Sequence, residues 1–312
     1  MSEPAAPRDL RHLAEAGVSV WLDPGSLPCD GGERRVDGLA GRGVGGVGPA
    51  LPAGRWQAWP GVTELAAPPD AWDEPERLVA LAGSASGADV VLALPSAEAA
   101  LKAAQELVFR GASISVWPVC SPREFRQAAD AYRLGLERRL AAGRSLAGLR
   151  AIAWIPVGAI DGHADAVIGH RCPELVGDVG PALAALIYLE SFRMPADPLW
   201  RRVREAGAAR PCPAFCELDT APTLGTLERL ALPGAIVSLS PERLAAVASG
   251  PRPVAAEPDE TEASWVVSRA CRSGQRLPAM SQALRVRLEV RARRAWLRPA
   301  LAEPAAAQAT SR

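Results

Sequence analysis

The amino-acid sequence predicts an α/β protein: a single-domain (β/α)₈ barrel with a helical extension at its C-terminal end. Two observations support this prediction. The length of 312 residues suits one such barrel, and short β-rich runs alternate with amphipathic stretches, as in parallel sheets with crossover helices. The eight runs are Val18–Leu22, Val44–Gly48, Val62–Ala66, Val90–Leu94, Ser113–Val119, Ala151–Val157, Pro213–Glu217 and Ala235–Leu239. A functional site is expected where the carboxyl ends of the strands meet.

Helix starts are marked by serine. Ser121 and Ser240 each precede a proline, which predicts an N-cap serine followed by proline at the first helical position. Ser96 is similarly expected to cap a helix that runs to about Arg110.

Three parts of the chain are predicted. Residues 1–250 form the barrel, and residues 251–301 form a polar linker followed by helices that pack on it. Residues 302–312 are rich in alanine and polar residues, and we expect a disordered tail there.

Composition excludes two classes of partner. The chain has 35 basic and 35 acidic residues, and this zero net charge argues against a nucleic-acid surface. No apolar run approaches the ~18 residues of a membrane span, and the N-terminal segment lacks the apolar region of a signal peptide. We therefore expect a cytoplasmic protein without membrane contact.

Cysteine and lysine usage bears on chemistry. The six cysteines are scattered, so buried free thiols are expected. A metal site built from His163, His170, Cys172, Cys212 and Cys216 is not predicted, because their spacing matches no zinc motif. No cofactor is predicted. Lys102 is the chain's one lysine, and we expect it on an exposed helix face.

Four segments follow one another at the first, fifth, sixth and eighth predicted strands: AEAGVSVWLD, GASISVWPVCSPREFRQAADAYRLGLERR, LAGLRAIAWIPVGAIDGHAD and GAIVSLSPERLAAVASG. In this order and spacing they resemble transaldolases, especially actinobacterial members, over roughly residues 8–250. The resemblance implies a barrel that moves a dihydroxyacetone unit between sugar phosphates in the pentose phosphate pathway. It also implies a fourth-strand lysine that forms a Schiff base with the donor ketone.

Here the resemblance places Ala93 at the lysine position. Alanine offers no nucleophile, so the chain is predicted to be inactive as a transaldolase. Asp23 matches the first-strand acid that handles protons during bond cleavage. The third-strand glutamate aligns near Leu65, with Glu64 beside it, and the register stays open.

Other pocket positions depart from the family pattern. The resemblance implies that Ser115 and Trp117 replace a fifth-strand Asn and Thr, that Trp154 and Ala159 replace a sixth-strand Ser and Arg, and that Glu217 lies on the seventh strand. The two indoles either fill the mouth of the barrel or line an apolar pocket. The rim is expected to be acidic and to repel sugar phosphates. Its acids are Asp23, Asp161, Glu217 and Asp219.

Two hypotheses follow. The first is a transaldolase-like pseudoenzyme that binds a small molecule or a protein. The second is an enzyme of altered chemistry that uses Asp23 with Glu217 or Cys120, with Cys216 and His163 as further candidates. The ligand, and whether the chain forms a homo-oligomer, stay open.

Overall fold

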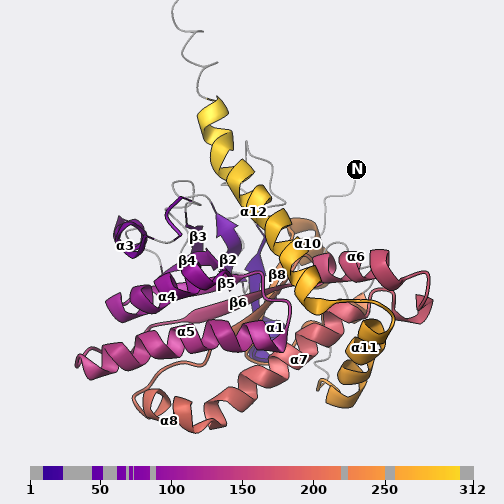
Figure 1. Cartoon of the computed structure of the whole chain (residues 1–312), viewed down its shortest axis with the longest axis horizontal. Coiled ribbons are helices and arrows are strands. Elements are labelled where there is room, and N and C mark those ends of the chain that lie inside the picture. The colour runs from indigo at the N-terminus through magenta and orange to yellow at the C-terminus, as the bar shows by residue number, and fades with distance from the viewer. Residues whose placement is uncertain are drawn as a thin grey trace, which may run out of the picture.

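The computed structural model describes residues 10–23, 44–51, 62–67, 70–72, 74–84, 89–218, 224–249 and 257–302. Eight parallel strands pair in chain order and close into a barrel surrounded by helices (Figure 1). The predicted (β/α)₈ fold is therefore confirmed. Asp219 and the tail from residue 303 onward lie outside the described residues.

The strands overlap all eight predicted runs. They are β1 (Ser19–Leu22), β2 (Val44–Leu51), β3 (Val62–Ala66), β4 (Asp89–Pro95), β5 (Ser113–Trp117), β6 (Ala151–Pro156), β7 (Cys212–Cys216) and β8 (Ile236–Leu239). The α-helices are α1 (Arg11–Glu15), α3 (Pro75–Ser84), α4 (Glu98–Arg110), α5 (Pro122–Ala141), α6 (Val157–Ile168), α7 (Val179–Arg193), α8 (Pro198–Glu205), α9 (Leu224–Leu230), α10 (Pro241–Ser249), α11 (Glu260–Arg272) and α12 (Leu277–Ala302). Short 3₁₀ turns occur at Pro173–Leu175 and Met194–Ala196.

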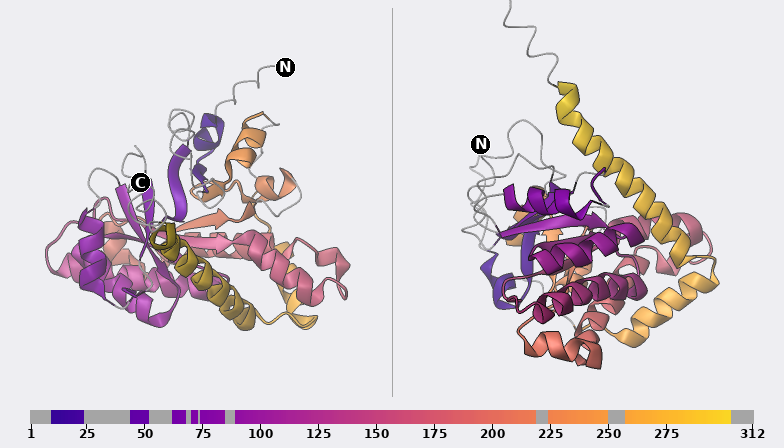
Figure 2. Two further views of the ribbon diagram at one scale, coloured as in Figure 1. Left: turned by 90° about the horizontal axis from the view of Figure 1, so that it is seen from above. Right: turned by 60° about the vertical axis from the view of Figure 1, so that its left-hand side comes forward.

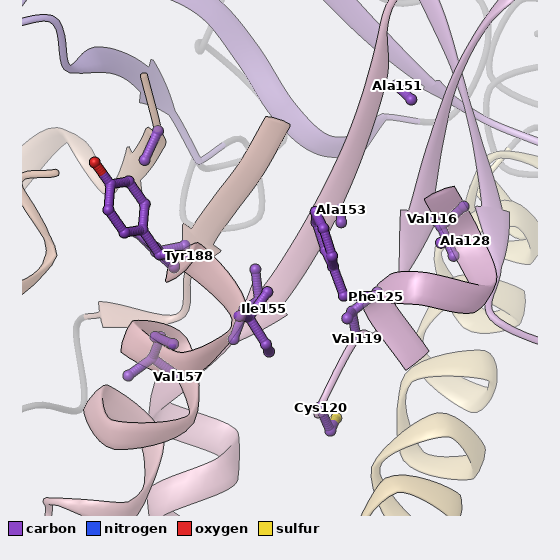
Figure 3. Close-up of a cluster of buried hydrophobic side chains, with 14 of the residues drawn as sticks. Val116, Val119, Cys120, Phe125, Ala128, Ala151, Ala153, Ile155, Val157 and Tyr188 are labelled. Carbon is purple, nitrogen blue, oxygen red and sulfur yellow. The ribbon is translucent and has the colours of Figure 1, made fainter. Parts of the chain in front are cut away.

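Strand residues alternate between two apolar cores because successive side chains point to opposite faces of a sheet. The larger core lies between strands and helices, where Phe125 and Ala128 of α5 face strand residues such as Val116 and Ala153 (Figure 3). The smaller core fills the barrel interior and includes Trp21, Val91, Ile152, Trp154, Ala214, Cys216 and Ile236. This inner core is where the candidate site lies.

Two of the three predicted helix caps are confirmed. Ser121 Oγ accepts the backbone N–H of Glu124, and Ser240 Oγ accepts that of Arg243, both at 3.3 Å. The prediction for Ser96 is wrong: α4 begins at Glu98 after Ala97, with no side-chain cap. The backbone N–H of Ser96 instead donates to the carbonyl of Trp117 at 3.0 Å, so this residue extends the sheet ladder beyond β4.

The two C-terminal helices pack on the barrel's helical layer, α11 against α7 and the start of α12 against α6. Figures 1 and 2 show that α12 continues past the body of the protein as a projecting helix. Across the described residues, no helix is both long and apolar enough to cross a membrane.

Candidate functional site

Ala93 lies on the inner face of the barrel. Its neighbours Leu92 and Leu94 belong to the outer core, whereas Val91, two residues earlier, belongs to the inner one. In the sheet Ala93 pairs directly with Ser115 of β5, and it is 8% exposed. The position that the resemblance assigns to a Schiff-base lysine therefore carries a methyl group inside the barrel.

Lys102 is remote from this interior. It lies on α4, in the outer helical layer, and its side chain is 72% exposed. Its Nζ is 2.9 Å from Glu98 Oε1, an ion pair one helical turn apart. The strand wall separates the chain's one lysine from every inward-facing residue.

A carboxylate lies at the centre of the barrel. Glu64 of β3 is fully buried in the interior, whereas Leu65 packs in the outer core, which settles the register that the sequence left open. Ser115 donates its hydroxyl proton to Glu64 Oε1, and Trp154 donates its indole N–H to the same oxygen at 2.8 Å. Three strands thus meet at one acidic side chain.

These donors explain how the acid is tolerated. Burying a carboxylate without hydrogen bonds costs several kcal/mol, and hydrogen bonds to charged groups contribute about 1.5–3 kcal/mol each. Ser115 and Trp154, both at predicted pocket positions, face Glu64 instead of an open space. Ser115 and Trp154 therefore belong to an internal hydrogen-bond network around Glu64.

Trp21 completes this interior, and the sequence interpretation did not single it out. Its ring meets that of Trp154 edge-on, with centroids 5.8 Å apart, and its Nε1 donates to Ser19 Oγ at 3.0 Å. The alternation of side chains along a strand could have revealed it, because Ser19, Trp21 and Asp23, two residues apart, must share one face of β1. Of the two alternatives for the predicted indoles, Trp154 fills the interior, because it is fully buried.

Glycines of β2 make room for the two rings. A Cβ at Gly48 would stand 2.5 Å from Glu64 Oε2 and 3.0 Å from the Trp154 ring. A Cβ at Gly46 would stand 2.6 Å from the Trp21 ring. Such distances are below van der Waals contact, so only glycine leaves the space that the tryptophans occupy.

Trp117 lies nearer the mouth. It ends β5, is half-buried and packs against the inner core. Its indole nitrogen is buried, and no hydrogen-bond partner for it is found among the residues that the structure describes.

Two of the predicted rim acids lie at the carboxyl ends of strands. Asp23 follows β1, and its backbone N–H donates to the carbonyl of Leu239 at the end of β8 at 2.8 Å. Glu217 follows β7 in a left-handed conformation with φ of 58°. No other non-glycine residue in the described ranges has positive φ. Both acids are half-buried.

Asp161 and Ala159 are not where the sequence interpretation put them. Asp161 is buried between α6 and α7 and accepts the backbone N–H of Gly180 at 2.6 Å. Burial raises the pKa of Asp161 to about 7, so it is no free rim charge. Ala159 packs against the outer core, within the first turn of α6. Both corrections arise because α6 begins immediately after β6 and turns these residues toward the helical layer.

The thiol candidates are buried. Burial, with the nearby Glu124 carboxylate, raises the pKa of Cys120 far above its usual range. Cys216 is fully buried, with Sγ 3.7 Å from the carbonyl of Ile155. Thiolate is the nucleophilic form of cysteine, and these surroundings oppose it. Burial and Arg287 lower the pKa of His163. Within the described ranges, no group of three or more His, Cys, Asp or Glu side chains could hold a metal.

Glu124 joins the mouth to the C-terminal helix. Its carboxylate accepts the backbone N–H of Cys120 at 2.8 Å and the hydroxyl of Ser281, which is buried on α12. Arg285, one turn later on α12, lies 3.6 Å from the same carboxylate. The loop after β5 is therefore tied to α12 through one side chain.

The fold and interior site define a parallel (β/α)₈ barrel whose inward-facing residues come from successive strands. No family model matches the chain. Over part of its length it is similar to curated transaldolases, which supports the transaldolase family.

The relatives have modest identity. Transaldolase 1 of Streptomyces avermitilis is 30% identical over 131 residues, which is 41% of this chain and 35% of the relative. The transaldolase of a Parafrankia species is 28% identical over 155 residues, 47% of this chain and 42% of the relative. That of Neisseria meningitidis is 28% identical over 138 residues, 44% of this chain and 38% of the relative. The chain thus spans well under half the length of each.

Proposed function

We propose that this chain is a transaldolase-like protein of carbohydrate metabolism, of pentose phosphate pathway ancestry, that has no transaldolase activity and acts by binding. The observation on which the proposal depends is the inward-facing methyl group of Ala93, at the position where the resemblance implies a Schiff-base lysine.

The reaction explains why this position matters. A neutral amine attacks the donor ketone, water leaves, and the resulting iminium accepts the electron pair of the breaking C–C bond. The amine must lie about 3–3.5 Å from the carbonyl carbon. Ala93 has no such group, and the Lys102 ammonium is on the outer surface, paired with Glu98.

The filled interior supports the same proposal. Trp154 and Ser115 both bind Glu64, and the Trp21 ring packs on Trp154. By the resemblance, Ser115 and Trp154 stand at substrate-pocket positions, so we infer that little space for a sugar backbone is left there. A ligand that binds this protein is therefore expected at the mouth, near Asp23, Glu217 and Trp117, above the closed interior.

The alternative of altered chemistry is favoured by one observation, the placement of Asp23 and Glu217 at strand ends of the mouth. Two carboxyl groups could act as acid and base. Cys120 is a poor nucleophile in this scheme because burial raises the pKa of its thiol. The alternative therefore rests on the two acids.

The test is reductive trapping. The purified protein is incubated with fructose 6-phosphate and borohydride, and its intact mass is measured beside that of the Streptomyces avermitilis transaldolase. We expect an adduct on the relative and none on this chain. Lys102→Arg removes the one lysine and serves as the matched control, with the same mass behaviour as the unmodified protein. A trapped adduct on the unmodified chain would refute the proposal, and peptide mapping would identify the amine.

The binding half of the proposal needs a separate measurement. A thermal-shift screen of sugars, sugar phosphates and other small metabolites reports stabilisation by any ligand that prefers the folded state. We expect uncharged compounds to outrank sugar phosphates, because Ala159 stands where the resemblance implies an arginine, the residue type that binds phosphate in two-point contacts. Turnover of a screened compound that is lost in Asp23→Asn would favour the alternative.

A further inference from the structure

Among the α12 side chains that the structure describes, those buried against the body lie near the start of the helix. Met280, Ser281 and Leu284 are buried, and the helix is anchored by the contacts of Ser281 and Arg285 with Glu124. The helix nevertheless runs for 26 residues, to Ala302. Figures 1 and 2 show its later turns extending away from the barrel and its surrounding helices. In proteins most helical stability comes from the packing of an apolar face, so an exposed apolar face on such a helix is a candidate docking surface.

The uncovered face of α12 has an apolar stripe. Ala279, Ala283, Val286 and Val290 are all exposed, and the two valines are 51% and 44% exposed. Their spacing of four, three and four residues is that of the core positions in a two-helix seam. Leu284 and Met280 face the body, so this stripe is a second apolar face on the same helix.

The width of the stripe favours a helix as the occupant. A seam of core positions alone is narrow and is typical of helix pairing. A helix that lies in a lipid surface presents a broader apolar face. In α12 arginines 285 and 287 flank Val286 on both sides, which leaves no broad apolar arc.

The charge of α12 indicates which kind of partner helix would bind it. Arg285 pairs with Glu124 of the body, but between residues 286 and 302 the sequence has five further arginines and one acidic residue, Glu289, in a chain whose net charge is zero. These arginines are at positions 287, 291, 293, 294 and 298. A second copy of α12 would carry the same positive charge, and like charges across a seam are destabilising. A helix with acidic residues beside its apolar seam is complementary in both respects.

We propose that the exposed stripe Ala279, Ala283, Val286 and Val290 of α12 is a docking face for an acidic amphipathic helix of another protein. The valines and alanines pack into the partner's seam, and the partner's carboxylates complement the positive charge of the α12 sequence. This proposal is independent of the proposed function, because it uses no residue of the barrel interior.

The experiment uses two synthetic peptide helices as probes. Both have leucine at their core positions, and they differ in flanking glutamate or flanking lysine. Binding to the full chain is measured by fluorescence anisotropy at low and high salt. We expect the glutamate peptide to bind, the lysine peptide not to bind, and salt to weaken the complex because it screens exposed charges.

Variants locate the face. Val286→Ser with Val290→Ser should weaken binding of the glutamate peptide at least about tenfold, a free-energy change that two buried valines can supply. Leu199→Ser, an equally exposed apolar position on α8, is the matched control and should leave binding unchanged. Both variants should keep the melting temperature of the parent chain, since the replaced side chains touch solvent.

Other results would overturn the proposal. If both peptides bind with equal affinity, or if the double valine variant binds the glutamate peptide as tightly as the parent chain, the stripe is not a docking face. A concentration-dependent dimer that the valine pair abolishes would assign the face to a second copy. Co-sedimentation with phosphatidylserine vesicles, lost in the same variant and without peptide binding, would assign it to a lipid surface.

Discussion

Trp154 donates its indole N–H to Glu64 Oε1 at 2.8 Å, and both side chains are fully buried inside the barrel. The bond joins β6 to β3 across the interior, and Ser115 of β5 donates to the same oxygen. This buried acid is thereby held by groups of the chain itself. The finding makes the interior a structural unit whose members depend on one another.

The first prediction concerns this dependence. Trp154→Phe keeps an aromatic ring but removes a donor from a buried carboxylate, and we expect a loss of about 1–3 kcal/mol in the free energy of unfolding. Glu64→Leu leaves two donors unpaired and should cost a similar amount. The double variant should cost less than the sum, because it removes both sides of the bond. Urea unfolding measures all three, with Trp265→Phe, an exposed position, as the control. Additive losses would contradict the network.

The second prediction is that Ala93→Lys does not restore transaldolase activity. The added chain must fit beside Ser115 and near the Trp154–Glu64 pair, in an interior that is already packed. A buried ammonium is also unfavourable, so the variant should melt below the parent protein. Ala93→Met, with a similar length and no charge, separates crowding from charge. Borohydride trapping and a coupled activity assay are the measurements. Activity near that of the relatives would show that the pocket is intact.

The third prediction concerns thiol reactivity. Cys271 is exposed on α11, whereas Cys120 is buried beside Glu124 with a raised pKa. Iodoacetamide should label Cys271 before Cys120, and peptide mass spectrometry should find Cys120 modified far more slowly. Ser281→Ala removes one tie between α12 and Glu124, so it should speed labelling of Cys120. Cys216, buried in the inner core, is the internal control and should stay unlabelled. Equal rates at Cys120 with and without the substitution would show that α12 does not shield this thiol.

The fourth prediction is a pH dependence. Burial raises the pKa of Asp161 from 3.8 to about 7, with Asp165 and Asp178 raising it further and Arg229 opposing them. Between these two values the folded protein binds more protons than the unfolded chain, so stability falls as pH rises. The loss is at most about 1.4 kcal/mol per pH unit and is complete above about pH 7.

Asp161→Asn keeps an oxygen for the Gly180 N–H but cannot ionise. Its melting temperature relative to the parent should therefore rise between pH 5 and pH 8. Asp197→Asn, at the exposed cap of α8, is the control and should show no such rise. A constant difference across this range would mean that Asp161 ionises normally.

The barrel could be predicted from the sequence because the strands are short and β-rich and most of them are followed by a helix with a marked start. The predicted N-caps at Ser121 and Ser240 were also confirmed, because a proline after each serine fixes the start of the helix. The prediction failed at Ser96 because a serine two residues before a helix can join the sheet instead. That choice depends on the neighbouring strand, which no local pattern encodes.

The site was predicted less completely. The periodicity of one strand predicts which residues share a face, but it does not predict which face points into the barrel. The sequence therefore left open whether Glu64 or Leu65 points inward. The resemblance drew attention to Trp117 and Trp154, where the chain departs from the family pattern, and away from Trp21, which lies inside the matched segment AEAGVSVWLD. Asp161 was misplaced because its partner, Gly180, is a long-range contact. Such contacts appear only when the helices are assembled around the sheet.

The glycines of β2 have a consequence for reading other sequences. A single methyl at Gly48 would stand 2.5 Å from Glu64 Oε2 and 3.0 Å from the Trp154 ring, so the glycine is required by the acid as well as by the tryptophan. Exchanging the tryptophan alone would leave the clash with the acid. Glycine on the second strand, glutamate on the third and tryptophan on the sixth therefore form a three-letter sign, readable without any structure, of a barrel whose centre is filled in this way.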